Sequence, residues 1–135
     1  MIYKFSTDKQ LLDLELITKE LQATYWASNR TAREIQKSVE QSLCFGAYID
    51  QEQIGFARVV TDFSTIAYLC DVFVVKKHQG QGVGKLLMNE VLNHPDLIGI
   101  AWFLRTRDAH HLYEKFGFSV NEQPRRYMER KAQKA

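Results

Sequence analysis

Apolar residues recur every three or four positions in the first third of the chain, which is the spacing of amphipathic helices. This pattern covers residues 12–21 and again residues 32–39. Thr31 and Glu34 form the T-x-x-E pattern of a capping box, so the second helix is predicted to start there. A short apolar run at residues 2–5 predicts a first strand ahead of both helices.

The hydrophobic pattern changes in the middle of the chain to one typical of strands. Residues 44–49 and 54–61 are apolar runs separated by the polar stretch 50–53, which predicts a β-hairpin. After a turn at residues 62–64, residues 65–75 form the longest strand candidate, rich in β-branched and aromatic side chains. Successive antiparallel strands follow from this order.

Helical spacing returns after a polar, glycine-rich loop at residues 76–84. Apolar residues between Val83 and Val91 predict a helix, and residues 100–104 predict a compact strand after it. A strand, a loop, a helix and a strand in this order predict two parallel strands joined by a right-handed crossover.

The end of the chain predicts one more helix and two closing strands. Residues 108–116 have the helix pattern, and Gly117 stands where a helix often ends. Residues 118–120 and 127–130 are the strand candidates. Together the elements predict an α/β fold in which helices flank a mixed sheet.

Length and composition fit a single domain over residues 1–135. The 135 residues, 45% of them apolar, are enough to build one core. Within that domain we distinguish the N-terminal helices and hairpin (1–62), the strand–loop–helix–strand passage (63–105), and the C-terminal helix with its closing strands (106–135).

The charge balance argues against nucleic acid or an anionic membrane as a bulk partner. Lys and Arg number 18 against 16 Asp and Glu, which gives a net charge of +2. We interpret the basic residues near the end as a solvated tail, with docking of an acidic partner or a nucleic acid as the alternative. These residues are Arg125, Arg126, Arg130, Lys131 and Lys134. The start has no signal pattern and no apolar run reaches membrane-spanning length, so a cytoplasmic protein is the expectation.

The two cysteines, Cys44 and Cys70, both lie in apolar runs. Their spacing fits neither a zinc motif nor a redox CxxC motif. We interpret them as buried thiols of a reducing compartment, with a disulfide as the alternative.

The loop at residues 79–85, with the sequence QGQGVGK, is the most informative segment. Glycines let a backbone come close to a ligand, and the first amides of a helix have no partner inside it. The helix dipole favours negative charge there, so a diphosphate suits the loop; a tight turn without a ligand is the alternative. Other phosphate motifs fail, because Leu86 follows Lys85 where a P-loop needs Ser or Thr, and Lys85 replaces the third glycine of a dinucleotide fingerprint.

Two motifs together resemble the GNAT family of N-acetyltransferases. Gln79-x-x-Gly82-x-Gly84 matches the family's Q/R-x-x-G-x-G/A signature, placed after a long strand and at the start of a helix. Residues 109–118, AHHLYEKFGF, look like its second signature, A-x-x-LYEK-x-GF. Thr106 stands where many members carry Asn, and a hydroxyl can make only some of an amide's hydrogen bonds. The resemblance covers nearly the whole chain.

The resemblance implies a twisted, mainly antiparallel sheet of about six or seven strands, flanked by about four helices, with a splayed parallel pair. It also implies acetyl-coenzyme A as the acetyl donor, its pyrophosphate on the loop amides and its pantetheine arm along the strand edge. A backbone N–H near residue 73 or 74 would face the thioester carbonyl. The residues implied in donor binding are Phe73, Val74, Val75, Gln79, Gly80, Gln81, Gly82, Val83, Gly84, Lys85 and Thr106.

Two residues are candidates for proton transfer. Tyr113 matches the family's general acid, which donates to the departing thiolate; a core aromatic residue is the alternative from the helix pattern alone. Asp71 should share a strand face with Phe73 and is the candidate general base, directly or through a water. Structural pairing of Asp71 with an arginine, such as Arg58 or Arg105, is an equal alternative.

The break between the first two helices contains the candidate acceptor-binding residues. Tyr25, Trp26 and Arg30 could bind an amine's apolar body or an acidic group. The alternative is that Trp26 fills the core and Arg30 caps a helix end. His110 and His111 are adjacent on a helix, so they face different ways and are expected in solvent. No metal site is expected.

The resulting functional hypothesis is transfer of an acetyl group from acetyl-coenzyme A to a primary amine, by direct attack in a ternary complex. The acceptor would be a small molecule or a peptide. Small members of the family often pair, so a homodimer is one further expectation. The alternative is a non-catalytic module of the same fold that binds coenzyme A or an acyl ligand and does not require Tyr113.

Overall fold

The computed structural model describes residues 2–133. It consists of two compact units, Met1–Arg105 and Thr106–Ala135. The first unit contains one sheet in the order β1-β2-β3-β4-β5. Its strands are β1 (Lys4–Ser6), β2 (Leu43–Ile49), β3 (Glu52–Thr61), β4 (Ile66–Val74) and β5 (Ala101–Leu104). Neighbours pair antiparallel from β1 to β4, and β4 pairs parallel with β5, which confirms the predicted pair of parallel strands.

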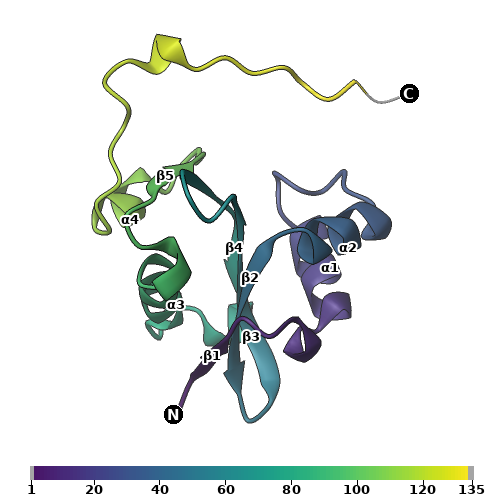
Figure 1. The fold of residues 1–135 in the computed structure, drawn as a ribbon. Helices are drawn as coiled ribbons and strands as arrows, with labels where there is room; N and C mark the ends of the chain where they lie inside the picture. Colours follow the sequence, from purple (N-terminus) through teal and green to yellow (C-terminus); the bar gives the residue numbers. More distant parts are fainter. Residues whose placement is uncertain (1, 134–135) are drawn as a thin grey trace. The chain divides into compact units, whose positions relative to one another are not determined.

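Helices cover both faces of this sheet (Figure 1). One face carries α1 (Leu14–Gln22) and α2 (Ala32–Glu40), and the other carries α3 (Val83–Leu92). Short 3₁₀ helices lie in the connections: η1 (Lys9–Leu11), η2 (Lys76–His78) and η3 (Pro95–Leu97). Within residues 2–133, no helix has both the length and the apolar character needed to cross a membrane.

The apolar stripes predicted from the sequence form the core on each side of the sheet. On the α1–α2 side the buried residues are Ile17, Leu21, Ala27, Ile35, Val39, Cys44 and Phe56. On the other side α3 buries Val83, Leu87, Met88 and Val91.

Local hydrogen bonds explain where several of these elements begin. The capping box is confirmed: the Thr31 hydroxyl accepts from the Glu34 amide at 3.1 Å, and the Glu34 carboxylate accepts from the Thr31 amide at 3.0 Å. The β2–β3 turn is tighter than the predicted polar stretch, because Ile49 already faces Glu52. The intervening residues 50 and 51 have φ values of 47° and 71°, the left-handed pair that suits the twist of a hairpin.

A β-bulge interrupts the pairing of β3 with β4. Phe56 faces Phe73 and Arg58 faces Cys70, so one residue of β3 opposes residues 71 and 72 of β4. The parallel pairing of β4 with β5 ends at Leu69, opposite Leu104. Residues 70–74 of β4 therefore extend beyond β5, which agrees with the splayed parallel pair that the resemblance implied.

The second unit contains α4 (His110–Glu114) and η4 (Pro124–Arg126), and α4 is shorter than predicted. The predicted closing strands at residues 118–120 and 127–130 are wrong, so within residues 2–133 the sheet has five strands rather than six or seven. Between them, the Asn121 side chain accepts from the Gln123 amide at 2.7 Å and Pro124 opens a 3₁₀ turn. Tyr127 is extended, with φ −98° and ψ 132°, but its amide donates to the Pro124 carbonyl at 3.2 Å and so closes this local turn.

Candidate functional site

The glycine loop connects β4 to α3 and owes its shape to two left-handed residues. Gly80 and Gly82 have φ values of 78° and 86°, a conformation in which other residues are strained. Gly84 is different, since it lies in the first turn of α3, and a Cβ built there would meet Val74 Cγ2 at 3.9 Å, an ordinary contact. The signature glycines at 82 and 84 therefore serve separate purposes.

The backbone amides of the loop and of the first turn of α3 are available to a ligand. Leu86 is the first residue of α3 whose amide has an acceptor, the carbonyl of Gly82 at 3.2 Å. Among residues 2–133, the amides of residues 80–85 donate to no protein acceptor, and no side chain caps this helix start. Free N–H groups at the positive end of a helix dipole are the physical requirement for binding an anion such as a diphosphate.

Side chains on either side hold the loop in place. Gln79 Nε2 donates to the carbonyl of Val74 at 2.9 Å, which ties the start of the loop to the end of β4. The Tyr3 hydroxyl donates to Gln81 Oε1 at 3.3 Å, which links the loop to the N-terminal segment. Gln79 thus supports the loop shape through its side chain.

The open edge of β4 presents its own backbone groups. The Val75 amide donates to the Ile54 carbonyl at 2.8 Å, toward β3. Successive strand residues direct their N–H and C=O groups to alternate edges, so those of Val74 face away from β3, where the carbonyl already accepts from Gln79 Nε2. Of the two amides proposed from the sequence, that of Val74 therefore lies on the open edge. The Phe73 side chain lies on a face of the sheet, where its ring packs against the Phe56 ring with centroids 5.7 Å apart.

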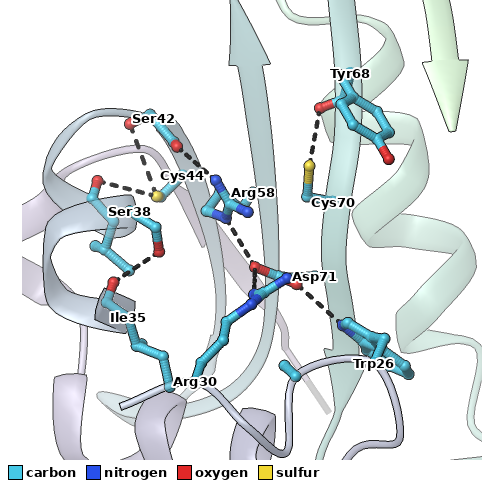
Figure 2. A network of polar contacts seen from close by, with 12 residues as sticks. Trp26, Arg30, Ile35, Ser38, Ser42, Cys44, Arg58, Tyr68, Cys70 and Asp71 are labelled. Atoms are coloured by element: carbon cyan, nitrogen blue, oxygen red, sulfur yellow. Dashed lines mark hydrogen bonds and ion pairs between the residues drawn. The ribbon is translucent and has the colours of Figure 1, made fainter. Parts of the chain in front are cut away.

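Asp71 lies at the bulge and is the centre of a polar network (Figure 2). Its Oδ1 accepts from Trp26 Nε1 at 3.0 Å, and its Oδ2 accepts from Arg30 Nη1 and Arg58 Nε, each at 2.8 Å. Arg58 Nη1 also donates to Ser42 Oγ at 3.0 Å. The pairing of Asp71 with Arg58 was one of the two alternatives from the sequence.

The charges around Asp71 outweigh its burial. Burial by itself would raise the pKa of Asp71, but the guanidinium groups of Arg58 and Arg30 hold it below the ordinary value for this carboxyl. The side chain is 1% exposed and already accepts the three hydrogen bonds described above. A carboxylate in this state is a weak base, and the geometry favours structural pairing over proton abstraction.

The connection between α1 and α2, residues 23–31, places aromatic side chains in solvent. Tyr25 and Trp26 are 52% and 43% exposed, and their rings meet edge to face with centroids 5.2 Å apart. Trp26 therefore does not fill the core, and Arg30 is bound to Asp71 rather than to a helix end. The sequence had assigned these residues and Asp71 to different roles, and the structure brings them together.

Comparison with known proteins identifies the family of this chain. A family model described as an acetyltransferase (GNAT) domain matches residues 40–120. The chain belongs to the GNAT acetyltransferase family.

Three relatives illustrate the relationship. The crystal structure of a Xanthomonas campestris protein assigned to the GNAT family is 43% identical, has a TM-score of 0.94, and covers 98% of this chain and 94% of its own. A Gibberella zeae protein named for an expected acetyltransferase activity is 32% identical over 84% of this chain and 76% of its own length. An Escherichia coli streptothricin acetyltransferase is 32% identical over 62% of this chain, which corresponds to 51% of that protein.

The second GNAT signature forms the closed end of α4. The Tyr113 carbonyl accepts from the Phe118 amide at 3.2 Å, and the Glu114 carbonyl accepts from the Gly117 amide at 3.1 Å. Gly117 has a φ of 89°, and the rings of Phe118 and Tyr113 meet with centroids 5.9 Å apart. These features define a Schellman motif with its hydrophobic contact, so the final GF of the signature has a structural reason.

The other candidates in the second unit have simple environments. The Thr106 hydroxyl accepts from the Ala109 amide at 2.9 Å, so its oxygen supports the start of α4 of this GNAT protein. His110 and His111 are exposed, as expected. In the part of the chain that the structure describes, no three His, Cys, Asp or Glu side chains gather as a metal site would require.

Both cysteines of this GNAT chain are free thiols. Cys44 is buried as predicted, and its Sγ donates to the Val39 carbonyl at 3.5 Å. Burial raises the pKa of Cys44 to about 11. Cys70 is only partly buried, which differs from the expectation, although burial raises the pKa of this thiol as well.

The sequence did not indicate that Trp26, Arg30 and Asp71 form one cluster. One signal was available, because Asp71 is a lone carboxylate inside an apolar strand, and a buried charge requires partners. That rule predicts that partners exist. It does not identify Trp26 or Arg30, which are 45 and 41 residues away in the chain.

Proposed function

We propose that this chain transfers an acetyl group from acetyl-coenzyme A to a primary amine, by direct attack in a ternary complex. The observation that carries the proposal is the row of free amides at residues 80–85 beside the open edge of β4. The amides suit a diphosphate, and an unpaired strand edge suits an extended arm that carries amide groups. The residues present therefore fit this donor.

Each protein group in the proposal has one task. The amides of residues 80–85 would hold the donor's pyrophosphate, and the Val74 N–H would donate to the thioester oxygen as negative charge grows there. When bound, acetyl-coenzyme A would supply an acetyl group on a sulfur leaving group. The Tyr113 hydroxyl would give its proton to that sulfur and regain one from solvent, a role that rests on the second signature.

The amine must be neutral before it attacks. An amine that resembles lysine has a pKa of about 10.4, so most of it carries an extra proton at neutral pH. We propose that this proton passes to water, because Asp71 is already occupied by Trp26, Arg30 and Arg58. The nitrogen–carbon bond then forms as the carbon–sulfur bond breaks, and the second amine proton also leaves to solvent.

The acceptor surface is proposed at residues 23–31, where Tyr25 and Trp26 are exposed. Aromatic faces attract both apolar bodies and cationic amines. The streptothricin acetyltransferase among the relatives gives a specific compound to include in a first survey of acceptors.

The test is an amine panel with acetyl-coenzyme A, followed by release of free thiol. The panel contains a polyamine, an amino-acid derivative, streptothricin, a peptide with a free N-terminus and a lysine-containing peptide. We expect donor binding in calorimetry and thiol release that depends on at least one amine. Binding without release from any amine would favour the non-catalytic module, and absence of donor binding would overturn the proposal.

A further inference from the structure

Asp71 has an unusual backbone conformation for a residue inside a strand. Its φ is 40°, in the left-handed region, which residues other than glycine adopt only at a cost in free energy. It occupies the bulge of β4, two residues after Leu69, where pairing with β5 ends. Residues 73 and 74 are still paired with β3, so the conformation of Asp71 sets the direction in which this end of β4 diverges from β5.

The side chain of Asp71 explains how this conformation is held. Its donors come from two separate parts of the first unit: Trp26 and Arg30 from the connection between α1 and α2, and Arg58 from β3 (Figure 2). The carboxylate is thus a junction between the proposed acceptor segment, residues 23–31, and the bulge that directs the Val74 amide.

A purely stabilising role does not account for such a junction. Removing the Asp71 carboxylate and the Arg58 guanidinium from water is costly, since their side chains are 1% and 11% exposed. Buried ion pairs are therefore weak evidence for stability, and geometric specificity is their better-supported use. A base role does not account for it either, since an incoming amine would have to displace Arg30, Arg58 or Trp26 from the carboxylate.

We infer that Asp71 is a positioning residue that locks the acceptor segment, residues 23–31, onto the bulge that aims the Val74 amide. This inference rests on the proposed function, because it assigns to Asp71 the relative placement of the acceptor segment and the Val74 amide. Asp71 acts through Trp26 and Arg30 and does not touch the reacting atoms.

Asp71→Asn is the principal variant, because asparagine keeps the shape and tolerates a left-handed backbone while the charge is lost. Asp50→Asn is the matched control, since Asp50 is exposed and also has a positive φ, of 47°, but lies in the β2–β3 turn outside this network. Arg30→Met breaks the same junction from the other side without altering the strand.

The first readout does not require activity. In a Trp102→Phe background Trp26 is the remaining tryptophan, because the chain has two. We expect Asp71→Asn and Arg30→Met each to increase acrylamide quenching of Trp26 and hydrogen exchange of residues 23–31, and Asp50→Asn to change neither. Unchanged quenching and exchange in the network variants would overturn the inference. If Asp71→Asn proves hard to fold, unchanged values in Arg30→Met alone are sufficient to overturn it.

The second readout separates positioning from proton abstraction. We expect Asp71→Asn to raise KM for the amine by about tenfold or more, to leave KM for acetyl-coenzyme A nearly unchanged, and to keep the shape of the pH–rate profile. The KM for the amine in the double variant Asp71→Asn/Arg30→Met should be little higher than in either single variant, since both substitutions break the same junction. Loss of a limb of the pH–rate profile with an unchanged KM for the amine would assign Asp71 as the base and overturn the inference. If the wild-type protein acetylates no amine, the proposed function fails, and the quenching and exchange results still decide whether the junction exists.

Discussion

At the scale of single residues, Asp71 combines burial, charge and backbone strain more than any other position discussed above. Its carboxylate is 1% exposed and bonds Arg30, Arg58 and Trp26. Loss of the carboxylate charge leaves Arg58, whose side chain is 11% exposed, without its ionic partner. The remaining unpaired guanidinium is the main source of the cost expected on mutation.

The stability of Asp71→Asn should depend on pH in a defined direction. At pH 7 we expect the variant to lose about 3 kcal/mol of unfolding free energy, because a buried ion pair is broken. The pKa of Asp71 is lowered in the folded state, so its contribution is complete above the ordinary value of about 3.9 and is lost as pH falls through the folded value. Urea unfolding should show a constant gap between wild type and variant from pH 7 to about pH 4, and a shrinking gap below that. A gap that widens with acid would contradict this account.

The two thiols should differ in their reactivity toward a thiol reagent. Cys44 is buried and burial raises its pKa to about 11, whereas Cys70 is partly exposed. Because the thiolate is the reactive form, native protein at pH 8 should be alkylated at Cys70 before Cys44, and both should react quickly in urea. Mass analysis of the peptides after timed alkylation measures the order, and equal native rates would mean that Cys44 is less enclosed than its geometry indicates.

At the scale of elements, the two signature glycines at the start of α3 allow the effect of backbone strain on ligand binding to be tested with a matched control. Gly82→Ala places a Cβ on a left-handed residue, so we expect a loss of about 1–2 kcal/mol of stability and displaced amides. Gly84→Ala is the matched control, because its Cβ makes an ordinary contact with Val74 and a helical alanine stabilises by up to about 1 kcal/mol. Calorimetry should show acetyl-coenzyme A binding weakened by about tenfold or more in Gly82→Ala and largely kept in Gly84→Ala. Equal losses in both would mean that the left-handed turn does not shape the site.

The closed end of α4 allows the Tyr113 hydroxyl to be tested without disturbing the helix. Tyr113→Phe keeps the ring contact with Phe118, so we expect unchanged folding and donor binding. Turnover should fall by well over about tenfold, since a general acid is worth that much or more. Tyr127→Phe, which removes a hydroxyl that accepts from Asn121 in the same unit, is the control and should keep its turnover. Unchanged turnover of Tyr113→Phe would remove this residue from the mechanism.

The same elements show how much of the fold could be predicted from the sequence. The helices and the antiparallel strands were predicted because apolar spacing and the capping box at Thr31 are local signals. The closing strands failed because a strand depends on a partner that its own residues do not specify. The bulge at Asp71 was not foreseen either, since a left-handed aspartate inside a strand has no reliable pattern, and its partners lie far away in the chain.

At the scale of the whole molecule, the sheet of the first unit joins the donor and acceptor elements. The end of β4, the glycine loop and α3 supply the free amides, while the segment between α1 and α2 supplies the exposed aromatic residues. The Asp71 junction connects the two within one unit. A donor that binds this arrangement should therefore favour the folded state as a whole, since unfolding would disperse every group that contacts it.

Mass action gives the size of that effect. A ligand that binds only the folded state adds about 2.7 kcal/mol of stability when its free concentration is a hundred times its Kd. We expect acetyl-coenzyme A to raise the urea midpoint and Tm progressively with concentration, and free pantetheine, which lacks the diphosphate, to have little effect at the same concentration. Gly82→Ala should need a higher acetyl-coenzyme A concentration for the same shift, whereas Gly84→Ala should follow the wild type. Equal stabilisation by pantetheine and acetyl-coenzyme A would show that the amides of residues 80–85 do not hold a diphosphate, and the donor site would have to be sought away from the start of α3.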